Sequence, residues 1–421
     1  MPIIECGFMP PDLLTSSIVD QRRIKVESSQ FDPSGNRSRV TTTQESLVAQ
    51  RTDFINVQFQ YNVAVNLDSS DIVGVATGLG SVSHANSMAA VSSGNGAGSY
   101  TLSSRDSIRY FTGHEFAGEM TAFVDVAGSN GYSAEWGIGD SQDAIGFAYR
   151  DGVFGCLMRR NGVDTFIPRD QMSHGLPDDI DPQYLNLWTF RGGWYGILPL
   201  QWGVYAGKDR GYITCHIEDL SNRQKTPHLS NATLPMYIKA ARTSGTGNVV
   251  VRSASWRGGI CGPLPARSKA DRSFNIKLPN RAISGSASTV LTPLITLRNN
   301  ATFQGKINHV RVRYGTLTIN CSSATKDVVI DVFKGGTLTG GTFVPKNTQT
   351  SVVDYNITAT AYTPPADSIG GLVMSGGQFA RINLLDGDVT LPVYPGESIT
   401  LTAQSDNNAV LGIFFRWLEE F

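Results

Sequence analysis

Four carboxylates fall close together in one segment and are the first candidates for chemistry. Residues 135–151, EWGIGDSQDAIGFAYRD, contain Glu135, Asp140, Asp143 and Asp151. Glycoside hydrolysis needs two such groups on either side of the scissile bond, one acting as acid and the other as base or nucleophile. The turn-forming neighbours of the three aspartates favour a different interpretation, in which these carboxylates are solvated turn residues.

The histidines lack the spacing of a metal or catalytic site. His114 precedes Glu115, and adjacent residues of a strand point to opposite faces. His216 is expected to share a strand face with Thr214 and Glu218, which is more typical of a satisfied polar face than of a ligand set. The sequence contains no calcium-loop, zinc-protease, phosphate-loop or nucleophile-elbow motif. We therefore expect that the protein is not an enzyme and that it binds no metal ion and no cofactor.

Charge and hydropathy exclude two classes of partner. The formal net charge is −1 and charged residues make up 17% of the chain, so no bulk attraction to nucleic acid or to an anionic membrane is expected. The basic pair Arg159–Arg160 is too small for a nucleic-acid footprint. No apolar run is long enough for a membrane-spanning helix, which predicts no membrane insertion.

Cysteine usage predicts a reducing compartment. The cysteines are odd in number and widely separated, namely Cys6, Cys156, Cys215, Cys261 and Cys321. This pattern favours reduced thiols over a disulfide framework or a zinc site. The opening residues have neither a basic nor an apolar segment of the secretory type, so we expect synthesis in a cytosol.

Composition and periodicity predict an all-β protein. Of the 421 residues 44 are glycine, and short β-branched runs alternate with Gly, Asn, Asp and Ser. Residues 1–50 are predicted to form an extended arm. Residues 51–263 are predicted to form a jelly-roll (concanavalin-like) β-sandwich, and residues 264–421 a second, C-terminal β-sandwich. A proline-containing, charged segment at 261–272 is the expected linker.

A tryptophan-rich stretch raises the question of a binding platform. Residues 186–205 contain three tryptophans. Alternating apolar residues at 198, 200, 202 and 204 predict a half-buried strand, with Trp202, and also Trp188, in the core. Trp194 and Tyr195 follow a tight turn and are the candidates for an interface or a glycan contact. The same alternation predicts strands with one buried face at 116–126 and 411–417.

Two groups of segments, taken in order, resemble a family of tailed-bacteriophage virion structural proteins. The first group comprises DQRRIKVESSQFD (20–32), LSSRDSIRYFTGHEFAGEMTAFV (102–124), LNLWTFRGGWYGILPLQWGVY (185–205) and LPMYIKAARTSGTGNVVVRSASWRGG (234–259). The second comprises RSFNIKLPNRAISGSASTVLTPLITLR (272–298), VFKGGTLTGGTFVP (332–345), SVVDYNITATAYT (351–363) and PGESITLTAQSDNNAVLGIFFRWLEEF (395–421). The last of these ends in a tail that resembles the family's W-x-E-E pattern, at Trp417, Glu419 and Glu420.

The resemblance implies a function without catalysis. It implies a tail, baseplate or head-surface fibre or spike, made in the bacterial cytoplasm and located in the virion. The arm would anchor it to other virion proteins, and it would assemble with copies of itself, usually as a homotrimer. Two alternatives remain open: a host-surface glycan-binding (receptor-binding) module, and more remotely a polysaccharide depolymerase that uses the carboxylates at 135–151.

Overall fold

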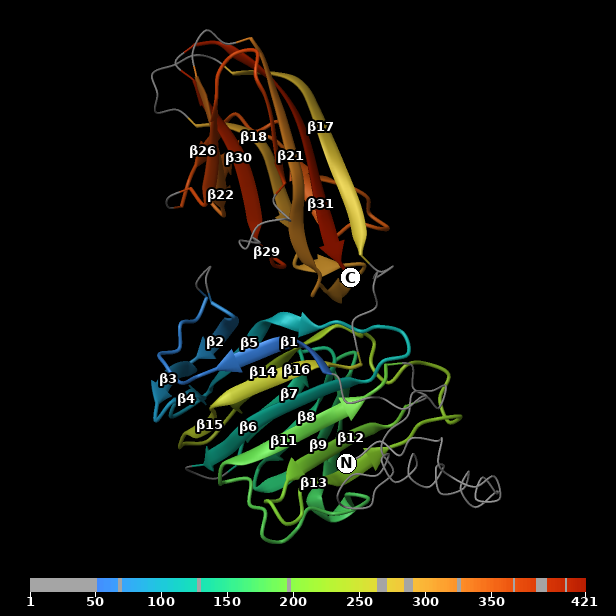
Figure 1. Ribbon diagram of the computed structural model, residues 1–421. Coiled ribbons are helices and arrows are strands. Elements are labelled where there is room, and N and C mark those ends of the chain that lie inside the picture. The colour runs from blue at the N-terminus through green and yellow to red at the C-terminus, as the bar shows by residue number, and fades with distance from the viewer. Residues whose placement is uncertain are drawn as a thin grey trace, which may run out of the picture. The chain divides into compact units, whose positions relative to one another are not determined.

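The protein is all-β, as predicted. The computed structural model (Figure 1) describes residues 51–66, 70–126, 130–194, 198–262, 271–283, 291–323, 327–365, 368–383, 392–405 and 407–421. The predicted arm (1–50) and most of the predicted linker lie outside these residues. Apart from one 3-10 turn, η3 (Arg169–Gln171), the regular elements of the described chain are strands. Within this part of the chain no helix has the length and apolarity needed to cross a membrane.

Two compact units share the described chain, one holding most of residues 51–262 and the other residues 271–421. The first unit contains two antiparallel sheets. The nine-stranded sheet has the order β13 (Tyr212–Glu218), β12 (Leu200–Tyr205), β11 (Asn186–Gly192), β6 (Phe116–Val126), β15 (Val249–Ser253), β4 (Met88–Ser92) and β3 (Ser81–Ala85), with β16 (Ser255–Cys261) joining β6 to β1 (Arg51–Gln58). The seven-stranded sheet has the order β10 (Val163–Pro168), β9 (Val153–Arg160), β8 (Ala144–Arg150), β7 (Tyr132–Gly139), β14 (Leu234–Arg242), β5 (Gly98–Ile108) and β2 (Ile72–Gly78).

Aromatic side chains fill the space between these two sheets. Trp188 of β11 lies 5.6 Å from Trp136 of β7 and 4.6 Å from Phe147 of β8, measured between ring centroids. The indole N–H of Trp202 in β12 donates to the carbonyl oxygen of Gly146 in β8 at 2.6 Å. This bond joins the two sheets directly, because a buried indole needs a hydrogen-bond acceptor.

The hairpins of the seven-stranded sheet turn where the sequence indicates. Asp151 and Gly152 connect β8 to β9 with φ angles of 46° and 86°. Asn161 and Gly162 connect β9 to β10 with φ angles of 50° and 76°. Two consecutive residues with positive φ define the type I′ turn that matches strand twist, and Asp-Gly and Asn-Gly are its preferred sequences. These turns set the register that brings the polar residues of β8, β9 and β10 together.

The second unit is also a two-sheet sandwich. Its five-stranded sheet has the order β17 (Arg272–Ile283), β31 (Ala409–Glu420), β21 (Arg311–Ser323) and β28 (Phe379–Asn383), with β29 (Pro392–Val393) beside β21. Its six-stranded sheet has the order β24 (Val344–Pro345), β25 (Val353–Asn356), β18 (Thr292–Asn299), β30 (Ser398–Ser405), β22 (Val328–Lys334) and β27 (Gly370–Met374). Two short hairpins complete it, β19 (Thr302–Phe303) with β20 (Lys306–Ile307) and β23 (Thr337–Thr339) with β26 (Ala361–Thr363).

A buried carboxylate organises the end of the last strand. Ile413, Phe415 and Trp417 lie in the core as their alternation predicts. Glu419 continues that face and is fully buried. Its carboxylate accepts hydrogen bonds from the Ser351 hydroxyl (2.5 Å), the Val352 backbone N–H (2.9 Å) and the Trp417 indole N–H (2.9 Å). Burial nevertheless raises the pKa of Glu419 above its ordinary value, against the effect of these donors.

We predict that Glu419→Ala lowers the free energy of unfolding of the second unit by about 2–4 kcal/mol, because three buried donors lose their acceptor. The exposed substitution Thr348→Ala should change it by less than about 0.5 kcal/mol. Chemical denaturation followed by tryptophan fluorescence and circular dichroism measures both. A Glu419→Ala variant as stable as the parent would show that this carboxylate does not hold the strand end.

Candidate functional site

A cluster of charged and polar side chains lies on the outer face of the seven-stranded sheet of the first unit. Trp136 points into the space between the sheets, so its neighbour Glu135 points to the opposite face. Strand register places Lys239 of β14 beside Glu135, and Asp164 of β10 beside Arg159 of β9. Five neighbouring strands, β7 to β10 and β14, therefore contribute to one cluster. The first four follow one another in the sequence, whereas Tyr237 of β14 is 102 residues from Glu135.

Glu135 is enclosed by cationic and phenolic donors. Its carboxylate oxygens both lie 3.2 Å from Nη2 of Arg159, and Oε1 lies 3.4 Å from Nη2 of Arg150. The Tyr237 hydroxyl donates to Oε2 at 3.3 Å, and Lys239 Nζ lies 3.9 Å from Oε1. Only 2% of the Glu135 surface is exposed, so these contacts replace its hydration.

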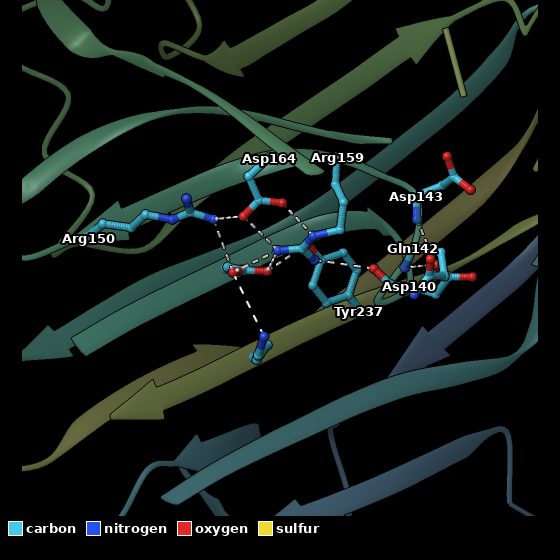
Figure 2. A network of polar contacts seen from close by, with 9 residues as sticks. Asp140, Gln142, Asp143, Arg150, Arg159, Asp164 and Tyr237 are labelled. Carbon is cyan, nitrogen blue, oxygen red and sulfur yellow. Dashed lines mark hydrogen bonds and ion pairs between the residues drawn. The ribbon is translucent and has the colours of Figure 1, made fainter. Parts of the chain in front are cut away.

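Asp164 closes the cluster from the edge strand. It accepts from Arg159 Nε at 2.6 Å and from Arg150 Nη2 at 2.5 Å, and Figure 2 shows these bonds together with that between Arg159 and the Asp140 carbonyl oxygen. Burial alone would raise the pKa of Asp164, but hydrogen bonds from Arg159 and Arg150 hold it below the ordinary value. The negative charges of Glu135 and Asp164 are thus balanced by the positive charges of the two arginines. These four side chains form a charged cluster that links neighbouring strands of the sheet.

The carboxylates predicted from sequence do not converge on one site. Asp151 occupies a turn, and Asp140 accepts from the backbone N–H groups of Gln142 and Asp143 at 2.6 and 2.8 Å. The interpretation of Asp143 as a solvated residue is wrong, because only 1% of its surface is exposed. Its carboxylate instead accepts from the backbone N–H of Ser230 at 2.7 Å and from the Ser230 hydroxyl.

A β-bulge changes the expected face at His216. The register of β12 and β13 shifts so that Trp202 opposes His216 and Gly203 opposes Thr214. Cys215 is the extra residue, and His216 therefore packs on the Trp202 ring while Thr214 lies on the other face. The prediction that they share a face is wrong. His216 keeps Glu218 as a neighbour, with Nε2 and Oε2 3.5 Å apart.

The described residues contain no group of three or more His, Cys, Asp and Glu side chains that could hold a metal ion. The four described cysteines, Cys156, Cys215, Cys261 and Cys321, are free thiols. Burial raises the pKa of the Cys215 thiol to about 12, which disfavours the reactive thiolate at neutral pH.

The tryptophan-rich stretch is mainly core. Trp188 and Trp202 are completely buried, as predicted. Trp194 is half-buried, its indole N–H donates to the Leu229 carbonyl oxygen at 2.9 Å, and its ring lies 5.7 Å from that of Tyr110. Its role as an interface or glycan contact remains a prediction, and Tyr195 lies outside the described residues.

An exposed aromatic pair was missed by sequence reasoning. Tyr205 ends β12 and opposes Tyr212, the first residue of the edge strand β13. Their ring centroids are 5.2 Å apart, and the two residues are 39% and 43% exposed. The apolar alternation at 198–204 could have indicated this pair. Val204 lies on the buried face, so its neighbour Tyr205 must face outward.

Charged side chains lie near Tyr212 and influence its hydroxyl. Gly203 opposes Thr189, whose hydroxyl lies only 2.6 Å from where a Cβ of Gly203 would be, so a side chain at 203 would clash next to the tyrosines. Burial and the nearby charge of Glu119 raise the pKa of Tyr212, while Arg191 acts in the opposite direction. Aromatic rings beside a few oriented polar groups are the usual composition of a small-ligand or sugar contact.

In fold the chain is similar to several solved structures. The carbohydrate recognition domain of Emp47p has a TM-score of 0.34 and 10% identity, covering 51% of this chain and 98% of that one. The metal-free lectin I-B4 of Griffonia simplicifolia has a TM-score of 0.29 and 14% identity, covering 49% and 99%. The CBM2 module of the evolved Dit of Lactobacillus casei BL23 phage J-1 has a TM-score of 0.33 and 11% identity, covering 52% and 99%.

The sequence itself matches no protein-family model and no curated protein. The structural similarities concern the lectin-like β-sandwich fold alone.

The charged cluster around Glu135 and Asp164 predicts that the free energy of unfolding depends on pH in a specific way. Because the pKa of Asp164 is lower in the folded protein than in the unfolded chain, its charge adds stability above the unfolded value of 3.8. That contribution is lost as pH falls through the folded value. Asp164→Asn should therefore destabilise the protein at pH 7 and have progressively less effect below pH 3.8.

Denaturation of both proteins across that pH range measures this difference, with the exposed substitution Asp209→Asn as the matched control. An equal loss of stability at every pH would show that the charge of Asp164 does not stabilise the cluster.

Proposed function

We propose that the chain is a non-enzymatic structural component of a bacteriophage virion, in a tail, baseplate or head-surface fibre or spike. In this proposal it is made in the host bacterial cytoplasm, attaches to other virion proteins through residues 1–50, and assembles with copies of itself as a homotrimer. The observation that carries the proposal is the order of the family-like segments along the chain. These segments occupy the arm and strands of both β-sandwich units.

The use of the buried charges supports a structural role. Glu135 is held by two arginines and a tyrosine that tie neighbouring strands together. Asp143 anchors the loop at Ser230. Glu419, within the family-like tail, fastens the last strand to residues 351 and 352. Each group makes contacts that rigidify a scaffold.

Deleting residues 1–45 should leave a folded protein that no longer enters particles. The described strands of the two units pair with one another within residues 51–420, and we expect circular dichroism and denaturation of the truncated form to match those of the full chain. The measurement is the amount of each form that copurifies with virions in a complementation assay. Normal incorporation of the truncated form would contradict the anchoring role of the arm.

Release of new reducing ends from a host capsule by the purified protein would contradict the non-enzymatic assignment.

The exposed aromatic pair favours a second role, in which the sandwich also contacts a host-surface glycan. Tyr205 and Tyr212 expose two rings, in edge-to-face contact at an interplanar angle of 60°, at the edge of the nine-stranded sheet. Rigid amphipathic rings bury contact area at low cost in conformational entropy, and their hydroxyl groups can bond to sugar hydroxyls. This role is compatible with a virion component.

Glycan-array binding should fall at least about tenfold for Tyr205→Ala with Tyr212→Ala, because the contact area of both rings is lost. Phe replacements at the same positions should keep most of the binding, since the rings remain. Trp194→Ala is the matched comparison. A loss of binding in the Trp194 variant alone would indicate that Trp194 makes the glycan contact instead of the tyrosine pair. Binding unaffected by every variant would contradict the assignment to the tyrosine pair and the assignment to Trp194.

A further inference from the structure

The second unit has an exposed sheet face that combines cations with aromatic rings. In β31 Ile413 and Phe415 point into the core, so Phe414 points to the outer face of the five-stranded sheet. Strands β17, β31 and β21 run side by side (Figure 1), and register aligns Lys277, Phe414 and Thr318 in one row. The row ends on β28 at Arg381, which opposes Thr318.

One further row lies on each side of the first. Phe379 of β28 opposes Asn320 of β21, which pairs with Gly412 of β31 on one side of Phe414. Arg416 of β31 lies on the other side of Phe414, opposite Asn275 of β17. Phe379 is 66% exposed and Phe414 38%, while Lys277, Arg381 and Arg416 are also exposed. Large exposed apolar side chains on one sheet face, with cations between and beside them, make this face a candidate interaction surface.

The cations of this face are available for an outside partner. Within the described part of the chain, Lys277 and Arg381 have no ion-pair partner, and Arg416 donates from Nε to the Ser273 hydroxyl at 2.7 Å. The acidic residue of the same face, Glu420, is already bound at 2.6 Å by Arg311 Nε and at 2.8 Å by Arg313 Nε. Among the described residues, this face therefore carries more positive than negative charge, on a chain whose net charge is −1.

We propose that this face, defined by Lys277, Thr318, Phe379, Arg381, Phe414 and Arg416, binds an acidic polysaccharide. Lys277 and Arg381 are three strand spacings apart, which is about 14 Å. That separation suits charges repeated along an extended polymer better than one small anion. The two phenylalanine rings provide apolar surface for the C–H faces of sugar rings, and the threonine and asparagine side chains between the cations can bond to hydroxyl groups.

Sparse charge favours a polysaccharide over a nucleic acid. Nucleic-acid binding rests on many phosphate contacts and on a strongly basic footprint. This face offers three exposed cations separated by neutral polar groups, and the whole chain has no net positive charge to steer a dense polyanion. The inference rests on the proposed attachment of the virion to a cell surface, but it concerns a different unit from the Tyr205–Tyr212 pair.

The test uses the full chain with polygalacturonate and polysialic acid as acidic probes, dextran as a neutral probe and a poly(dT) oligonucleotide. Binding to an acidic probe is expected, with affinity that falls as salt rises. Lys277→Glu with Arg381→Glu should weaken it at least about tenfold. Lys208→Glu with Lys225→Glu makes the same change in net charge at exposed positions of the first unit and should leave it nearly unchanged.

Phe414→Ala should weaken binding at both low and high salt, because ring contact is not screened.

Three results would overturn the inference: no binding to either acidic probe, equal loss in the two charge-reversal variants, or tighter binding to poly(dT). Each can be told apart from failure of the proposed function. Loss of acidic-probe binding leaves the virion and Tyr205–Tyr212 experiments unaffected, and a protein absent from particles could still bind the acidic probes through this face.

Discussion

The structure depends first on the burial of indole rings whose N–H groups must find acceptors. Five of the six tryptophans donate to an acceptor within the described chain. The Trp202 bond to Gly146 crosses from one sheet of the first unit to the other, and the Trp417 bond fixes the Glu419 carboxylate in the second. Trp136 is the exception, because its buried indole N–H has no hydrogen-bond partner among the residues that the structure describes. Because unpaired buried polar groups are costly, these bonds restrict how the sheets can pack.

The alternation of apolar and polar residues in the sequence is sufficient to predict much of this fold. It predicts few of the polar contacts. The buried faces of 116–126, 200–204 and 411–417 follow from period-two patterns, and the Asp-Gly and Asn-Gly turns follow from their φ requirements. The polar cluster around Glu135 includes Tyr237, which is 102 residues away in the sequence. Its formation therefore depends on the order of the strands in the sheet. The bulge at Cys215 inverts the face of Thr214 relative to His216, and nothing in the local pattern indicates it.

Charged residues serve two separate purposes in this chain. Those with little exposure, such as Glu135, Arg159 and Glu419, are paired or hydrogen-bonded and tie strands that are distant in sequence. Those on the outer face of the second unit, such as Lys277 and Arg381, are exposed and available. This division suits a rigid particle component that presents surfaces to a partner, because the scaffold keeps its shape while the exposed side chains make the contacts.

The most direct measurement for the proposed virion role is quantitative mass spectrometry of phage particles purified from host cells that produce the chain. The account predicts that the 45.5 kDa chain is present at a fixed copy number per particle that is a multiple of three. Absence of the chain from particles that are otherwise complete and infectious would contradict it.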